Sequence, residues 1–155
     1  FLASVPGQHV SSLADILRLG MYDVALDGPF RRRDSLGTRD NAAYREALAR
    51  RTVVRNMVVA FLDSNRYDAL VYPTWSNPPR LIGDLNTPAG DNNQLFSPST
   101  GYPAITVPMG YTRGVLPAGL QFFGRPWSEA TLIRLAYSYE QATYWRREPP
   151  LKSKR

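Results

Sequence analysis

Three short apolar segments in the second half of the chain constrain its fold more than any other feature. They are residues 67–72 (YDALVY), 103–108 (PAITVP) and 119–124 (GLQFFG). Each has the length of a strand, and a continuous apolar run is typical of strands that are covered on both faces. The connection of about ten residues between the last two is too short for a crossover helix. We therefore expect these two segments to be adjacent antiparallel strands.

Apolar residues at helical spacing predict a short helix over residues 12–19. Ser12 is placed to cap its N-terminus, with Asp15 three residues later in a weaker form of the capping box. Gly20 fits the position at which a helix ends. The stretch that follows, residues 21–38, contains several glycines and a proline, and we expect it to form a loop.

A much longer helix is expected from Asp40 or Asn41 to Ser64, with Asp40 as a good N-cap. Another is expected over residues 128–144, with Ser128 as its cap and an apolar stripe that packs on the strands. The stripe includes Leu132, Leu135 and Ala136.

The remaining segments are expected to be irregular, residues 74–102 as a long connection and residues 110–118 as a turn. The element order is then α-α-β-β-β-α, an α/β fold. Strands of this kind need cover on both faces, and the three helices suffice for about one. We therefore expect the chain to be part of something larger, with an apolar surface left bare. That surface is expected around Val71, Ile105, Val107, Leu120 and Phe122.

Composition excludes several kinds of site. Without Cys there is no disulfide, thiolate nucleophile or Cys-based zinc site, and a single His excludes any site built from several histidines. The only lysines, Lys152 and Lys154, lie in a charged C-terminal tail, where a lowered pKa is not expected. The patterns GxSxG, HExxH, Walker A and GxGxxG are absent. By pattern alone, the chain carries no identifiable catalytic machinery.

The net charge of +6 raises the question of a polyanion partner, because the basic residues include the cluster Arg31-Arg32-Arg33. Two interpretations remain, a phosphate-binding loop and a solvated loop paired locally with Asp27, Asp34 and Asp40; we favour the second. We expect no nucleic-acid partner. The apolar runs are too short to span a bilayer and no signal peptide is visible, so we expect no membrane partner and a cytoplasmic protein.

Three blocks of the sequence resemble the C-terminal part of the amidase signature family. They are residues 67–74 (YDALVYPT), 101–110 (GYPAITVPMG) and 116–125 (LPAGLQFFGR), and the likeness covers about residues 66–150. The resemblance implies an α/β/α sandwich with a mixed sheet. It also implies hydrolysis of a carboxylic amide C–N bond by a Ser–cis-Ser–Lys triad, without a metal or organic cofactor.

The family's catalytic serines and lysine belong to an earlier Gly/Ser-rich region, which this chain lacks. Residues 1–150 are thus interpreted as the C-terminal portion of a single amidase domain and residues 151–155 as a basic tail. No catalytic residue is expected in the chain, and the chain alone is predicted to be inactive. The hydroxyl cluster Ser97, Ser99 and Thr100 does not align with the family's catalytic serines and is interpreted as loop and turn residues.

The resemblance also implies that this part helps to close a substrate pocket. We expect substrate contacts at the end of the first strand and just before the second. The candidates are Thr74, Trp75, Asn92, Asn93 and Phe96. Both aromatics also fit the alternative of packing under the long loop. The expected partners are the N-terminal catalytic part of the same enzyme and a small-molecule amide, with homo-oligomers also envisaged. The competing hypothesis is a non-catalytic module on an amidase-like scaffold that binds a protein or a polyanion.

Overall fold

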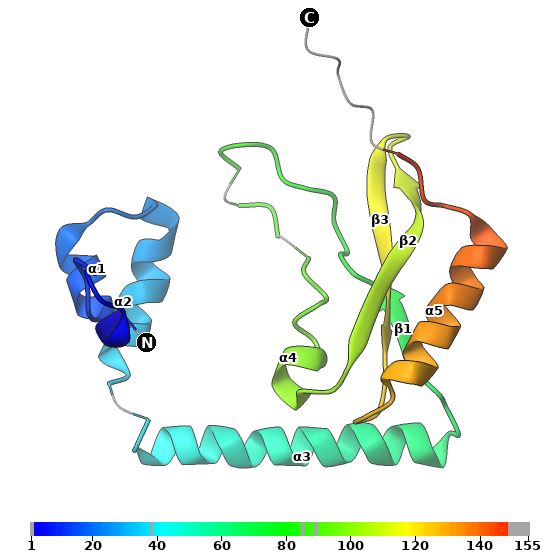
Figure 1. The fold of residues 1–155 in the computed structure, drawn as a ribbon, viewed down its shortest axis with the longest axis horizontal. Helices are drawn as coiled ribbons and strands as arrows, with labels where there is room; N and C mark the ends of the chain where they lie inside the picture. The colour runs from blue at the N-terminus through cyan, green and yellow to red at the C-terminus, as the bar shows by residue number, and fades with distance from the viewer. Residues whose placement is uncertain (1, 38, 85, 89, 149–155) are drawn as a thin grey trace, which may run out of the picture. The chain divides into compact units, whose positions relative to one another are not determined.

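The computed structural model describes residues 2–37, 39–84, 86–88 and 90–148. The chain divides into two compact units, Phe1–Leu48 and Ala49–Arg155, which are described one after the other (Figure 1). The basic tail expected at residues 151–155 lies outside the described residues.

The first unit contains the predicted short helix, α1 (Leu13–Leu19). The Ser12 hydroxyl accepts a hydrogen bond from the Asp15 amide at 3.1 Å, and the Asp15 carboxylate accepts one from the Ser12 amide at 3.1 Å. At the other end Gly20 has a φ of 66° and its amide donates to the Ile16 carbonyl at 3.1 Å. The predicted capping box and C-terminal glycine are confirmed.

The loop expected over residues 21–38 is wrong, because α2 (Asp27–Ser35) lies within it. Pro29 is in the first turn of this helix, where an amide would have no partner within the helix. Arg31 pairs with Asp27 one turn earlier at 2.8 Å. The arginine cluster therefore lies on a helix and not on the favoured loop, and the favoured pairing is found for Asp27, whereas Asp40 pairs with Arg45. Two 3₁₀ turns precede the two helices of this stretch, η1 (Leu2–Ser4) and η2 (Val24–Leu26).

The predicted long helix is α3 (Ala42–Ser64), 23 residues and about 35 Å in length. The Asn41 side chain accepts a hydrogen bond from the Tyr44 amide at 2.8 Å and so caps the helix. Asp40, the expected N-cap, instead pairs with Arg45 at 2.8 Å. The cap is one residue later than predicted because the helix begins at Ala42.

The second unit contains a three-stranded sheet in the order β1-β3-β2, from β1 (Leu70–Pro73), β2 (Ala104–Thr112) and β3 (Leu116–Phe123). Both neighbouring pairs are antiparallel, which confirms the pairing predicted for the last two strands (Figure 1). The α/β class is confirmed. The mixed pairing implied by the resemblance is not found among these three strands.

The turn expected at residues 110–118 is wrong in extent. The register shifts between Pro108 and Gly110, a bulge that lets β2 continue past the proline to Thr112. Only residues 113–115 lie between the strands, and Arg113 and Gly114 have φ values of 49° and 78°. β2 and β3 thus form a long hairpin that projects beyond the end of β1.

The helix α5 (Glu129–Thr143) covers one face of the sheet. Leu132 and Ala136 are buried against Val107 and Phe122, and Leu135 packs beside them, as predicted. Ser128 precedes the helix, but its hydroxyl donates to the Arg125 carbonyl at 2.8 Å and makes no capping bond. Ser128 is thus the N-cap residue, as predicted, but its side chain does not cap the helix.

The other face of the sheet packs against Val58 and Leu62 of α3, together with Tyr102 and Phe96 around Phe123. Phe96 and the short helix α4 (Ser97–Thr100) come from the connection that was expected to be irregular throughout.

The bare surface predicted around five strand residues is wrong for four of them. Val107 and Phe122 are buried, Ile105 and Leu120 are half-buried, and only Val71 is exposed, at 56%. All five point to one face of the sheet, because cross-strand neighbours share a face, and that face is the one α5 covers. Exposed apolar side chains are found on α3 instead, among them Val53, Met57 and Phe61.

Candidate functional site

The chain leaves the sheet at the end of β1. Close contacts between Thr74 and β3 fix the point at which it leaves. The Thr74 amide donates to the Gly119 carbonyl at 2.7 Å. The Thr74 side chain is buried, with its hydroxyl 3.3 Å from that of Thr106. A Cβ at position 119 would lie 2.8 Å from both threonine side chains. A glycine in the middle strand is therefore needed for the strand end to sit where it does.

Asn92, near the far end of the connection between β1 and β2, is hydrogen-bonded to the end of β1. Its backbone amide donates to the Thr74 carbonyl at 3.0 Å, and its side-chain amide donates to the Pro73 carbonyl at 2.8 Å. The Ser76 hydroxyl is within 3.2 Å of both polar atoms of the Asn92 side chain. Asn92 thus closes the base of the loop, and its side-chain amide is already engaged within the protein.

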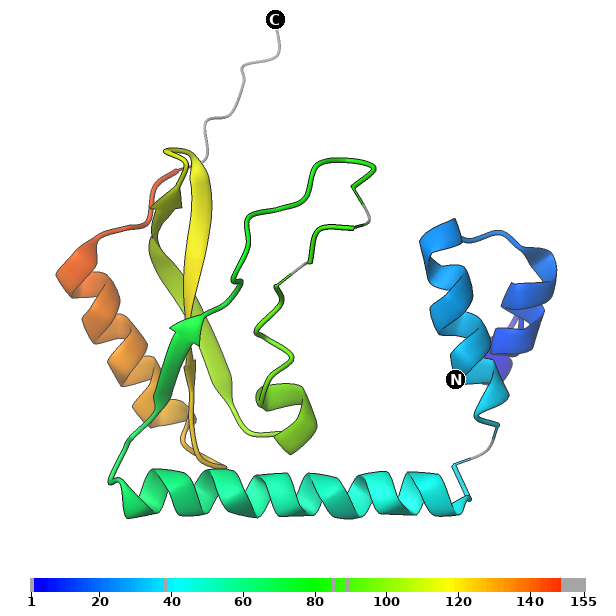
Figure 2. The ribbon, with the colours of Figure 1, turned by 180° about the vertical axis from the view of Figure 1, so that it is seen from behind.

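A pocket of about 620 Å³ opens between the start of this loop and the β2–β3 hairpin. Figure 2 shows the loop leaving the tip of β1 and running beside the β2–β3 hairpin. One wall consists of Pro73 and residues 75–80. The other wall comes from the hairpin, through Met109, Thr112, Arg113 and residues 117–119. The volume is that of a typical small-molecule site.

Apolar groups and two arginines dominate the lining. Trp75 has 48% of its surface exposed, and prolines 73, 78, 79 and 117 surround it with Met109. Arg80 and Arg113 are exposed, and within the described ranges neither forms a salt bridge. Hydrogen bonds from Thr87 and Asn86 keep the pKa of Asp84 below its ordinary value, with a small further contribution from the Arg80 charge. The pocket lining itself contains no carboxylate.

The structure brings some of the sequence-predicted residues together and separates others. Trp75 lines the pocket, while Thr74 and Asn92 lie outside the lining and fix the base of the loop. Asn93 donates its backbone amide to the Asp91 carboxylate at 2.9 Å, away from the lining. Phe96 lies in the core, with its ring centroid 5.3 Å from that of Phe123.

The hairpin side of the pocket was missed by sequence reasoning. Arg113, Met109 and Gly119 belong to it, whereas one strand was expected to end at Pro108 and the other to begin at Gly119. The available signal was Arg113-Gly114, a dipeptide suited to a tight hairpin turn between two extended segments. Arg80 follows two prolines in the connection, where no periodic pattern gives its position.

The hydroxyl groups of the cluster in α4 are hydrogen-bonded to nearby backbone carbonyls. Ser97 donates to the Tyr102 carbonyl at 2.8 Å, and Thr100 donates to the Phe96 carbonyl at 2.7 Å. Ser99 also donates to the Phe96 carbonyl, at 3.0 Å. These hydroxyls are local turn and helix contacts, as interpreted from the sequence.

Across the described ranges, no group of acidic or histidine side chains is arranged to hold a metal ion. Nor does any described helix have the length and apolarity needed to cross a membrane.

A family model described as Amidase matches residues 30–133. A glutamyl-tRNA(Gln) amidotransferase subunit from Moorella thermoacetica is 39% identical over 121 residues, which are 72% of this chain and 23% of that protein. The same-named subunit from Thermodesulfovibrio yellowstonii is 34% identical over 132 residues, 78% of this chain and 27% of that protein. This chain therefore spans about a quarter of the length of these curated relatives.

Solved structures match over nearly the whole chain. The native peptide amidase from Stenotrophomonas maltophilia has a TM-score of 0.69 and 32% identity, covering 94% of this chain and 30% of the amidase. An amidase family protein from Bacillus anthracis has a TM-score of 0.72 over 97% of this chain, and at 21% identity it supports the fold alone.

Proposed function

Because this chain belongs to the amidase family, we propose that it is the C-terminal part of an amidase signature hydrolase. The whole enzyme cleaves a carboxylic amide C–N bond with a serine nucleophile located outside this chain. This part completes the sheet and supplies one side of the substrate pocket. The observation that carries the proposal is the coverage of the peptide amidase match, which takes in 94% of this chain but only 30% of that enzyme.

The chemistry of the described residues supports a non-catalytic part in the reaction. The hydroxyls of Ser97, Ser99 and Thr100 donate to backbone carbonyls, and none of the described basic side chains is bonded to them. A serine nucleophile needs such a base within hydrogen-bond reach. By the family resemblance, the lysine and the two serines of the triad lie in the remainder of the enzyme.

The geometry supports a positioning part for this chain. The bonds that Thr74 makes to Gly119 and Thr106 fix the end of β1, and Asn92 fixes the base of the loop that follows. The exposed face of Trp75 is thereby held beside the hairpin. We assign Trp75 as a wall for the apolar portion of an amide substrate, with Thr74 and Asn92 as positioning residues. Catalysis benefits from such fixed orientation of the reacting bond.

The test is a chimera in which this chain replaces the corresponding segment of the Stenotrophomonas maltophilia peptide amidase. The purified 155-residue chain alone should hydrolyse no peptide amide above background, whereas the chimera should turn over. Trp75→Ala in the chimera should lower kcat/KM about tenfold, since a large apolar contact is lost. Trp127→Ala is the matched control, because Trp127 is 91% exposed and lies outside the pocket lining.

Two results would overturn the proposal. One is multiple turnover by the chain alone. The other is a chimera without activity whose circular dichroism and thermal melting match those of the parent enzyme. A chimera that fails to fold is replaced by co-expression of the chain with the remaining part of the amidase as a separate polypeptide, and absence of both binding and activity there also contradicts the proposal.

A further inference from the structure

We propose that the pocket between residues 73–80 and the hairpin is a subsite for a carboxylate attached to a flat apolar group. Arg80 and Arg113 would bind the carboxylate, and Trp75 would contact the apolar body. As a statement about substrate this rests on the proposed function, since the ligand would be an acidic amide. As a statement about binding it concerns this chain by itself.

The size and apolar lining of the pocket indicate the body of the ligand. A volume of about 620 Å³ accommodates a one- or two-ring group with a polar substituent. The half-exposed Trp75 side chain offers an aromatic surface, and Met109 and several prolines complete an apolar enclosure. Flat ligands gain from stacking on such a surface.

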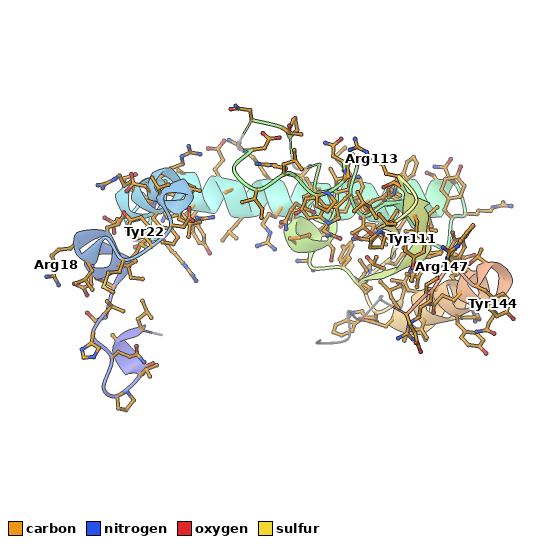
Figure 3. The ribbon with its side chains drawn as sticks, turned by 90° about the horizontal axis from the view of Figure 1, so that it is seen from above. Arg18, Tyr22, Tyr111, Arg113, Tyr144 and Arg147 are labelled. Carbon is orange, nitrogen blue, oxygen red and sulfur yellow. The ribbon has the colours of Figure 1, made fainter. Side chains whose placement is uncertain are left out.

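The charges indicate the polar end of the ligand. The lining contains two guanidinium groups and no carboxylate, so the lining itself carries positive charge. Asp84, whose carboxyl pKa the Arg80 charge helps to lower, lies outside the lining. A third arginine near the hairpin, Arg147, lies over the Tyr111 ring with 4.8 Å between its Cζ and the ring centroid. Figure 3 shows Arg113 on the same hairpin, apart from this pair. A guanidinium binds a carboxylate through two parallel hydrogen bonds, which favours that anion over a neutral amide.

Both arginines extend from backbone that has little freedom to move. Arg113 and Gly114 form the left-handed turn of the hairpin. Arg80 follows Pro78-Pro79, whose φ angles are fixed by their rings. The loop segment that bears Arg80 is also bonded to the other side of the same loop. The Asn77 side-chain amide donates to the Pro88 carbonyl at 2.9 Å. Groups held in this way lose less entropy when a ligand binds.

The experiment is a titration of the 155-residue chain with 2-naphthoate and with its neutral isostere 2-naphthamide, followed by isothermal calorimetry and tryptophan fluorescence. We expect 2-naphthoate to bind about tenfold more tightly, as two partly exposed charge-assisted contacts allow. Arg80→Gln with Arg113→Gln should remove this preference and leave 2-naphthamide affinity unchanged. Trp75→Ala should weaken both ligands. Arg134→Gln on α5 is the matched control for the single variants Arg80→Gln and Arg113→Gln, because it too removes one charge, from an exposed site outside the lining.

Equal affinity for the two ligands would overturn the inference. So would an equal loss of 2-naphthoate affinity in the Arg134 variant, which would indicate a general charge effect. The outcome is separable from that of the chimera, since binding here needs no turnover. Selective binding with an inactive chimera would refute the amidase proposal and leave the subsite, while an active chimera without selectivity would refute the subsite alone.

Discussion

At the scale of single residues, Gly119 shows most directly how one side-chain atom would disturb the site. Because a Cβ there would lie 2.8 Å from Thr74 and Thr106, Gly119→Ala must push β1 or β2 away from β3. We expect a loss of about 1–3 kcal/mol in the free energy of unfolding. Urea titration of the whole chain measures it. Gly28→Ala in α2, where the added Cβ meets no atom within 4 Å, is the control and should not destabilise the chain.

A second residue-scale prediction concerns Asp15 and pH. Hydrogen bonds from Ser11, first through its backbone amide, and from Ser12 hold the pKa of the Asp15 carboxyl far below its ordinary value of 3.8. A carboxyl whose pKa falls on folding stabilises the folded state above its ordinary pKa and loses that effect as the pH drops further. The capping of α1 should therefore weaken below about pH 4. Far-ultraviolet circular dichroism should show this loss, and Asp15→Asn should show reduced helicity at pH 7 with a flatter acid profile.

At the scale of elements, the contact between α5 and the sheet decides the stability of the second unit. Leu132 is 2% exposed in the cluster with Phe122, whereas its neighbour Ile133 is 58% exposed. Leu132→Ala should cost about 2–5 kcal/mol, and Ile133→Ala should cost less than about 0.5 kcal/mol. Chemical denaturation of both variants compares them. Similar losses would mean that α5 packs through a different face.

The elements that the sequence predicted well are those with a strong local pattern. The helix α1 has its capping box and terminal glycine, and α5 has an apolar stripe one turn apart. The elements that were predicted wrongly depend on local features that a periodic pattern of apolar residues does not reveal. α2 tolerates Pro29 because the proline is in its first turn, and β2 passes Pro108 by a bulge. Within the candidate site, Trp75 was predicted because it comes soon after a strand. Arg113 was not predicted, because its place in the pocket depends on how far β2 and β3 extend.

At the scale of the whole molecule, the part of α3 in the second unit presents an apolar face that the described residues of that unit leave exposed. Val53, Val54, Met57 and Phe61 fall within one arc of the helix and are 57%, 37%, 65% and 50% exposed. The adjacent arc is buried through Val58 and Leu62. An arrangement of this kind marks a surface that another polypeptide covers. We propose that the remainder of the enzyme occupies it.

The isolated chain should consequently self-associate at micromolar concentration through this face of α3. Met57→Glu combined with Phe61→Glu should shift the chain toward monomer, because it places charges within the apolar arc. Sedimentation velocity measures the change. Ile133→Glu, which adds one charge to the exposed side of α5, is the control and should leave the association unchanged. Monomeric wild-type chain at these concentrations would contradict the prediction.

The closed base of the loop after β1 also bears on how this region can diversify. Asn92, Ser76 and Asn77 join the two sides of the excursion by hydrogen bonds, while Ile82 near its tip is fully exposed. A ten-residue Gly/Ser insertion between residues 82 and 83 should then lower the Tm by only a few degrees, because lengthening a closed loop costs about 0.6 kcal/mol per doubling. The same insertion between Ser76 and Asn77 should lower it much more. Homologues are therefore free to lengthen or shorten this tip, and protein engineers to graft peptides there, while the strand end below keeps its geometry.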